Sequence, residues 1–173
     1  MGQFAQQIVT AAKISRSYAE RLLVGVTPQQ FARAPVSNGK LVQTNHPAWV
    51  YGHLALYPAR IAAMVGLDAS RLATPANFEE LFKDATESKD DAKGTIYPAM
   101  ESITGAFFRA HDSLFEVLGG VDDAKLMAPT IDEKARARFP QVGGRILFMC
   151  NNHVAMHLGQ VSAWRRFMGL PPA

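Results

Sequence analysis

The sequence predicts an all-α protein, a four-helix bundle, from three observations. Four stretches of about 20 residues repeat apolar side chains at spacings of three and four, the period of an amphipathic helix. No segment is convincing as a strand. The long connection over residues 67–97 lets the second and third helices run parallel by crossing over, which a short loop would forbid.

Composition fits a single globular domain over residues 1–173. Hydrophobic residues make up 48% of the 173 residues and charged residues 19%, which is typical of a folded protein. No apolar run reaches the ~20 residues that a membrane span needs, and no signal peptide is visible, so no membrane association is expected. A single cysteine, Cys150, permits no internal disulfide and suits the cytoplasm, the predicted location.

The charge pattern argues against a nucleic-acid partner. The net charge is +3, and the basic residues are scattered along the chain. No Lys/Arg-rich run with interleaved aromatic residues is present, so nucleic-acid binding has little support.

The first helix is expected over residues 3–24, where Phe4, Ile8 and Leu22 belong to a sustained apolar stripe. A capping box from Thr27 to Gln30 then predicts a short helix. The following SNGK sequence predicts a turn. None of these features points to chemistry.

The second helix is expected to begin at HPAW, with Pro47 at its first helical position and His46 or Asn45 as the cap. It should end near Gly66. Pro58 lies inside it and predicts a kink, because the proline ring displaces the carbonyl four residues earlier.

Two histidines lie on the inward face of this second helix. His53 is in mid-helix, level with a buried layer, whereas His46 is at the helix start, where capping or exposure is the default. Two helical turns separate them by about 10 Å, so both cannot bind the same ion. We favour His53 as a metal ligand, with His46 as the alternative.

The connection over residues 67–97 is expected to be irregular, apart from a helical turn or two at ANFEELF. Its acidic pair, Asp90 and Asp91, is expected to be solvated, because no third ligand is spaced nearby. The third helix should run over residues 98–118. His111 lies on the shoulder of its apolar stripe and is expected to be a partly buried surface histidine rather than a pocket residue.

A second long connection, 121–142, leads to the last helix. Its alternating Lys134, Arg136 and Arg138 are expected to lie in a solvated, extended or frayed segment. The fourth helix should span residues 143–169 and carries His153 and His157. Residues four apart share a helix face, with Cβ atoms about 5–6 Å apart. Their neighbours on this face are mostly apolar, so both imidazoles are expected to point inward.

His53, His153 and His157 are therefore the candidate metal ligands. Three neutral imidazoles suit zinc, nickel, copper or iron, and they leave positions open for water. The alternative reading is a satisfied core histidine beside a partly exposed neighbour, since an HxxxH spacing is common. Cys150, one turn before His153, is predicted to be a buried core residue rather than a fourth ligand.

The segments PAWVYGHLA, FEELF…DDAKGTIYP and HVAMHLGQVSAWRRFMGLPP together resemble the DinB-like superfamily, over roughly residues 4–170. The resemblance implies a four-helix bundle in an up-down-down-up arrangement, and a homodimer. It implies metal ligands at His53, His153 and His157. Related branches include transferases and isomerases that use a low-molecular-weight thiol, and metal-dependent hydrolases. The additional His46 departs from the simplest family pattern and leaves the ligand of the second helix open.

The resulting expectation is an enzyme that uses a divalent transition metal, with zinc or nickel favoured, to activate a water or a low-molecular-weight thiol against a small-molecule substrate. No Asp or Glu is placed on the pocket face, which slightly favours thiol activation. Arg60 would either anchor an anionic group or pair with a carboxylate. The residues expected to shape the pocket are Trp49, Tyr57, Arg60, Gln160 and Trp164.

Two other classes of function remain. The chain could be a non-catalytic metal-binding or stress-response bundle that acts through dimerisation. It could also be a bundle whose histidines are only core residues. Stoichiometric metal, and the effect of its removal on stability, would separate the three classes.

Overall fold

The computed structural model describes residues 2–173, and helices make up most of them. The all-α class is therefore confirmed. Within the described range, no helix is both long enough and apolar enough to cross a membrane. In chain order the elements are α1 (Gln3–Leu22), α2 (Pro28–Phe31), β1 (Val36–Ser37), β2 (Lys40–Leu41), α3 (Pro47–Ala55), α4 (Tyr57–Met64), η1 (Ser70–Leu72), α5 (Asn77–Phe82), α6 (Met100–Leu118), α7 (Asp123–Leu126), α8 (Glu133–Arg136), α9 (Val142–Leu147), η2 (Phe148–His153) and α10 (Val154–Phe167).

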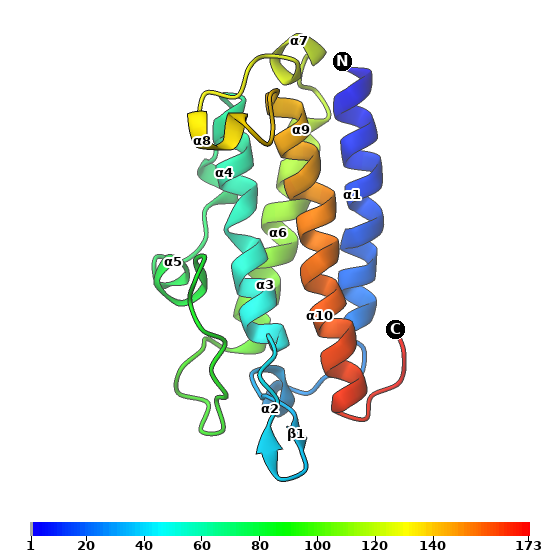
Figure 1. The fold of residues 1–173 in the computed structure, drawn as a ribbon, viewed down its shortest axis with the longest axis vertical. Coiled ribbons are helices and arrows are strands. Elements are labelled where there is room, and N and C mark those ends of the chain that lie inside the picture. The colour runs from blue at the N-terminus through cyan, green and yellow to red at the C-terminus, as the bar shows by residue number, and fades with distance from the viewer. Residues whose placement is uncertain (1) are drawn as a thin grey trace.

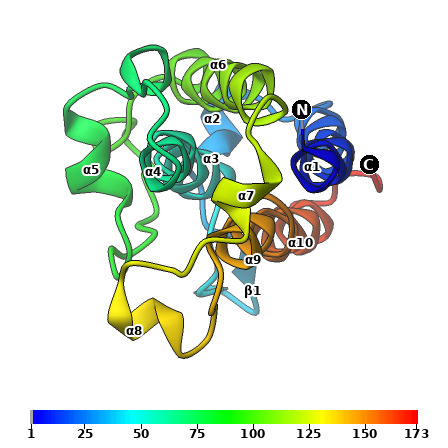
Figure 2. The same cartoon turned by 90° about the horizontal axis from the view of Figure 1, so that it is seen from above.

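The long helical segments lie side by side around a common interior (Figures 1 and 2). In Figure 1, α1 runs downward, α3 and α4 run upward, α6 runs upward, and the segment from α9 to α10 runs downward. α3 packs against α6 and α10, and α1 packs against the same two helices. The connection that contains η1 and α5 returns the chain to the lower end before α6 begins.

α3 is the most deeply buried helix, since every residue from Pro47 to Ala55 is buried. Its sequence is apolar on all sides, which is the composition of a helix enclosed by its neighbours. The Tyr51 hydroxyl donates to the Ala19 carbonyl at 2.5 Å and joins α3 to α1. As a result, any polar side chain on α3 enters the interior. The largest fully buried side chains of the chain include Trp164, Tyr51, Phe31, Phe78, Phe82 and Phe107.

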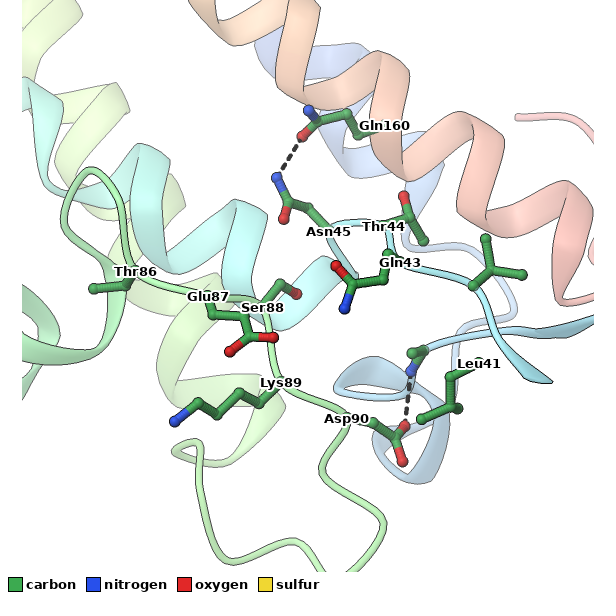
Figure 3. A pocket seen from close by; sticks show the side chains of 12 residues that line it. Leu41, Gln43, Thr44, Asn45, Thr86, Glu87, Ser88, Lys89, Asp90 and Gln160 are labelled. Carbon is green, nitrogen blue, oxygen red and sulfur yellow. Dashed lines mark hydrogen bonds between the residues drawn. The ribbon is translucent and has the colours of Figure 1, made fainter.

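The predicted start and kink of the second helix are both confirmed. His46 is the N-cap of α3, and its ring nitrogen Nδ1 accepts a hydrogen bond from the Trp49 N–H at 3.3 Å. Helix α3 ends at Ala55 and α4 begins at Tyr57, immediately before Pro58. The segment before α3 is tied to α10, because the Asn45 amide donates to Gln160 Oε1 at 3.0 Å (Figure 3).

The last long helix is continuous over the predicted range but is not uniform. Its middle, η2, is a π-helix over six residues that ends at His153. π-Helical turns inside α-helices are often found at functional sites. The helix ends at Phe167, and Gly169 stops it as expected, since its φ of 73° is the left-handed conformation that glycine adopts readily.

The predicted SNGK turn is confirmed, but the expectation that no segment is a strand is wrong. The turn is flanked by short strands, so β1 and β2 form a hairpin in which Val36 pairs with Leu41. Its turn residues Asn38 and Gly39 both have positive φ, and an Asn-Gly pair is the usual sequence of such a two-residue turn. The second connection contains the one-turn helices α7 and α8.

Arg136 is exposed, as expected, but its side chain is also bound to nearby backbone carbonyls. Its guanidinium donates from Nε to the Thr130 carbonyl at 2.6 Å and from Nη2 to the Ile131 carbonyl at 3.0 Å. These hydrogen bonds join α8 to the two residues that precede its N-cap. Lys134 and Arg138 are exposed, in agreement with the expectation.

Two other residues, His111 and Asp91, are more buried than predicted. His111 is 5% exposed, and its Nδ1–H donates to the Phe107 carbonyl at 2.9 Å. The ring contacts those of Phe107 and Phe115, and helix α1 packs against α6. Asp91 is 6% exposed because its carboxylate accepts the backbone N–H groups of residues 95–97. Asp90 pairs with Arg33 at 2.8 Å.

Candidate metal centre

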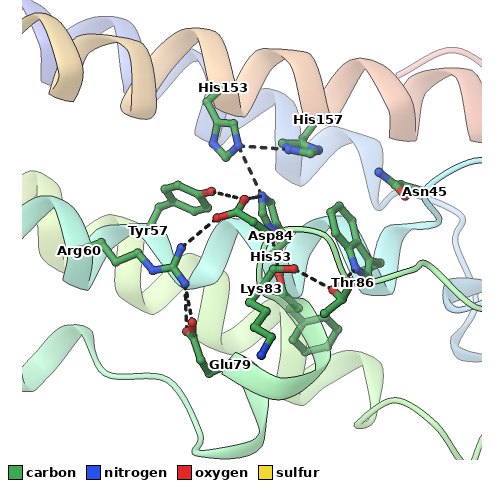
Figure 4. A network of polar contacts seen from close by, with 12 residues as sticks. Asn45, His53, Tyr57, Arg60, Glu79, Lys83, Asp84, Thr86, His153 and His157 are labelled. Carbon is green, nitrogen blue, oxygen red and sulfur yellow. Dashed lines mark hydrogen bonds and ion pairs between the residues drawn. The ribbon is translucent and has the colours of Figure 1, made fainter. Parts of the chain in front are cut away.

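Three histidines converge between α3 and the last long helix (Figure 4). His53 comes from α3, His153 from the end of η2 and His157 from α10. The Nε2 atom of His153 lies 3.1 Å from that of His157 and 3.4 Å from that of His53. One ligand atom from each residue lies within 4.8 Å of the others. The structure thus brings together the three residues that the sequence singled out.

Hydrogen bonds to the outer nitrogens of His53 and His157 determine which nitrogen of each ring is free to bind a metal. His53 Nδ1 lies 2.7 Å from the Phe82 carbonyl, which can only accept, so Nδ1 carries the proton. His157 Nδ1 lies 2.9 Å from Gln160 Oε1, which also accepts from the Asn45 amide. Both rings therefore present an unprotonated Nε2 to the centre. Such partners on the outer nitrogen are the usual support of a metal-binding histidine.

The donor set fits a divalent transition metal. A proton on His153 Nε2 could form a hydrogen bond to His53 Nε2 or to His157 Nε2, but not to both. A cation bound by the lone pairs of all three Nε2 atoms would give each of these atoms a partner. Imidazole nitrogen is a preferred ligand of zinc, nickel and copper. The Nδ1 atom of His153 is buried and has no hydrogen-bond partner among residues 2–173.

Burial keeps all three imidazoles neutral at neutral pH. It is the main cause that lowers the pKa of His53 and of His157 below the ordinary value of 6.5. Burial lowers the pKa of His153 further, to about 4, with additional contributions from the neighbouring His157 and His53. Neutral imidazole is the form that binds a metal, so the three rings are already in the protonation state that a metal site requires.

A carboxylate that the sequence analysis did not anticipate lies beside the histidines. Asp84 Oδ1 is 3.9 Å from His53 Nε2 and accepts a hydrogen bond from the Tyr57 hydroxyl at 2.9 Å (Figure 4). Arg60 Nη1 lies 3.6 Å from the other Asp84 oxygen, and Arg60 Nη2 binds both oxygens of Glu79. The expectation of a pocket without an acidic residue is therefore wrong, and Arg60 pairs with carboxylates.

A comparison with known protein families covers the residues of this site. Residues 11–161 match the family model of the DinB superfamily. The chain belongs to the DinB superfamily. A search of curated proteins found no match. The matched range of this DinB-superfamily chain includes His53, His153, His157 and the loop that supplies Asp84.

Two aromatic rings line the histidine cluster of this DinB-superfamily protein. The Trp49 indole stacks on His53 with ring centres 4.7 Å apart and planes within 10°, and its Nε1–H donates to Thr86 Oγ1. The Tyr57 ring lies 4.4 Å from that of His153. Trp164, also expected in the pocket, is instead fully buried and donates to the Arg33 carbonyl at 2.7 Å.

The remaining candidates of the DinB-superfamily chain do not belong to the cluster. Both ring nitrogens of His46 are engaged, one with the Trp49 N–H and the other, at 2.8 Å, with the Lys89 carbonyl. His46 is therefore a structural cap rather than the ligand from the second helix. Cys150 is a buried core residue, as predicted, and burial raises the pKa of its thiol to about 12.

A cavity of about 680 Å³ adjoins the cluster (Figure 3). Gln160 lines this cavity and also holds His157, so the cavity and the cluster share a wall. Its opposite walls are the segments before α3 and after α5, which supply mainly polar side chains. The polar lining residues include Gln43, Thr44, Asn45, Thr86, Glu87, Ser88, Lys89 and Asp90.

Proposed function

We propose that the protein is a metal-dependent enzyme that holds a divalent transition metal, zinc or nickel, at His53, His153 and His157. The observation that carries the proposal is the convergence of three Nε2 atoms, from the buried His53 and the half-buried His153 and His157. The outer nitrogens of His53 and His157 are held by Phe82 and Gln160. When bound, such an ion lowers the pKa of a water or thiol ligand and supplies a nucleophile near neutral pH.

In this proposal Asp84 accepts the proton that the nucleophile loses. Its side chain is 71% exposed, so Oδ1 can exchange protons with solvent, and it lies 3.9 Å from His53 Nε2. The Tyr57 hydroxyl donates to Oδ1 and orients it. Burial raises the pKa of Tyr57, so the phenol remains a donor at neutral pH. Arg60 stays charged and keeps the carboxylate in place.

The cavity beside Gln160 is the proposed substrate site. A volume of about 680 Å³ is in the range of small-molecule pockets. Its amides and hydroxyls would recognise a polar compound, and a low-molecular-weight thiol is one that would fit this chemistry. Because Gln160 touches both the cavity wall and His157, a ligand there would lie next to the metal ligands.

Metal analysis of protein purified without a histidine tag tests the site. We expect about one equivalent of zinc or nickel in the parent and in His46→Ala, and little in His53→Ala or His157→Ala, with helical circular dichroism checking that each variant folds. Metal retained by both His53→Ala and His157→Ala would contradict the site.

Catalysis is tested by comparing Asp84→Asn with the parent in thiol-transfer and hydrolysis screens. We expect Asp84→Asn to keep its metal and lose turnover by roughly 100-fold or more, the usual range for a proton-transfer group. If no turnover is detected and removal of the metal mainly lowers stability, the ion has a structural role and the enzyme proposal is wrong.

A further inference from the structure

A second cavity, of about 340 Å³, lies between α4, the residues before α8, and α9. Most of its wall is apolar, from Ala63 and Met64 on α4, Ile131 in the connection and Val142 at the start of α9. The remaining lining residues are Arg60, Thr130, Asp132 and Arg145. Neither the sequence patterns nor the proposed chemistry accounts for this cavity.

Thr130 is the informative residue in this wall. It is 2% exposed, and its hydroxyl oxygen is buried without a hydrogen-bond partner in the part of the chain that the structure describes. The backbone around it is held firmly, because its N–H donates to the Pro140 carbonyl at 3.0 Å and its carbonyl accepts from Arg136. A buried hydroxyl without a partner costs stability, and a ligand oxygen in the cavity would remove that cost.

Arg145 gives the wall a group that can bind an anion. The guanidinium of Arg60 is already paired with Glu79 and Asp84, whereas that of Arg145 is paired, within the described part of the chain, with Asp132 alone. Arg145 uses Nη1 for Asp132, at 3.2 Å, and its Nε and Nη2 make no hydrogen bond to residues 2–173. A guanidinium has five N–H donors and binds carboxylates well, so Arg145 retains capacity for a second carboxylate.

The apolar wall of the cavity can bind the hydrocarbon part of a ligand. Ile131 lines the cavity, yet it is 85% exposed. A hydrocarbon chain against Ile131, Met64 and Val142 would remove apolar surface from water, which is the main source of affinity for such groups.

We infer that this cavity binds a small organic acid with an apolar body, whose carboxylate accepts hydrogen bonds from Thr130 Oγ1 and Arg145 while its hydrocarbon part packs on Ile131, Met64 and Val142. The inference goes beyond the proposed function and requires no metal. The two sites are neighbours, because Arg60 lines this cavity and also contacts Asp84.

Calorimetric titration with octanoate tests the inference, using protein both loaded with zinc and stripped by a chelator. We expect saturable binding of one octanoate in both forms, and binding of octanol at least tenfold weaker. Thr130→Val keeps the side-chain shape and removes the hydroxyl, so it should fold and should weaken octanoate binding about fivefold. Arg145→Gln should weaken it more. Thr10→Val, on the exposed face of α1, is the matched control and should bind as the parent does.

Four results would overturn the inference. The first is the absence of saturable octanoate binding at millimolar concentration. The second is an octanoate affinity that is unchanged in both Thr130→Val and Arg145→Gln. The third is octanol that binds as well as octanoate. The fourth is binding that disappears when zinc is removed, because the carboxylate would then be on the ion. Failure of the metal proposal leaves octanoate binding to the stripped protein untouched, so the two proposals fail separately.

Discussion

Replacing Gly52 by alanine tests how closely the metal centre depends on core packing. A Cβ at this position would lie 2.6 Å from three ring carbons of Phe82, well inside the ~3.5 Å of favourable carbon contact. The Phe82 ring is fully buried, stacks on Tyr97 at 5.7 Å and meets Phe78 edge-on at 5.0 Å. We expect a shift of this enclosed ring to move the Phe82 backbone carbonyl, which accepts a hydrogen bond from His53 Nδ1.

The expected magnitude combines two opposing effects. Overpacking a core costs about 1–3 kcal/mol, whereas glycine to alanine inside a helix contributes about 1 kcal/mol of stability. The net loss for Gly52→Ala is therefore about 1 kcal/mol, measured by urea unfolding of the metal-free protein. Displacement of the Phe82 carbonyl removes a partner from the outer nitrogen of His53, which typically lowers metal affinity 10–100-fold. Zinc competition against a chromophoric chelator measures that loss.

Gly105→Ala is the matched control. Gly105 lies inside α6, and a Cβ there meets no atom within 4 Å. This variant should gain about 0.5–1 kcal/mol and keep the zinc affinity of the parent. The reasoning would be refuted if Gly52→Ala matched Gly105→Ala in both stability and zinc affinity, because the Phe82 ring could then relax without affecting His53.

Three further predictions concern buried groups away from the centre. Burial lowers the pKa of His111 to about 4, so below pH 6.5 the unfolded chain binds a proton that the folded protein does not, and stability should fall as pH drops from 6.5 to 4. This residue contributes about 3 kcal/mol to the fall, and urea midpoints of metal-free His111→Leu should show a shallower pH dependence than those of the parent; an equal slope would contradict it. The buried Cys150, with its pKa raised to about 12, should resist iodoacetamide at pH 8 in the native protein and react fully in denaturant; rapid native labelling, read by mass spectrometry, would count against the structure. Trp164→Phe should lower the unfolding free energy by about 2 kcal/mol, because it leaves the Arg33 carbonyl without its donor and opens a gap in the core; a stability equal to the parent would show that the indole bond adds nothing.

Local rules were enough to predict the long helices and the three histidines that converge. The spacing of His153 and His157 is one helical turn, so a single helix decides that they share a face. His53 lies in a segment that is apolar on all sides, and a helix with such a sequence is buried in the interior. Pro58 interrupts the helix through its own covalent structure, so the break also follows from the sequence.

The features that the sequence did not reveal depend on contacts between distant segments. Asp84 reaches the centre because Phe82, two residues earlier, is anchored in the core, and periodicity cannot place a loop residue. His111 is on the edge of an apolar stripe, where the packing of the neighbouring helix decides exposure; here α1 packs against α6, and His111 is buried. The strand pairing around the predicted SNGK turn was also missed, although the Asn-Gly pair is a local signal for a hairpin.

The π-helical turn before α10 determines how the protein tolerates changes in chain length. A π turn holds more residues than an α turn, so loss of one residue from Phe148–His153 could convert it to α-helix and leave α9 and α10 intact. The residues beyond such a deletion would keep their helical phase, because the π turn already absorbs one extra residue. A deletion inside α10 between His153 and His157 would instead rotate every later residue by about 100° around the axis and shift it by about 1.5 Å. His157 would then face a different neighbour, although the helix itself would survive. A deletion in the loop between α7 and α8 changes no helical phase, so the centre should be far less sensitive to it.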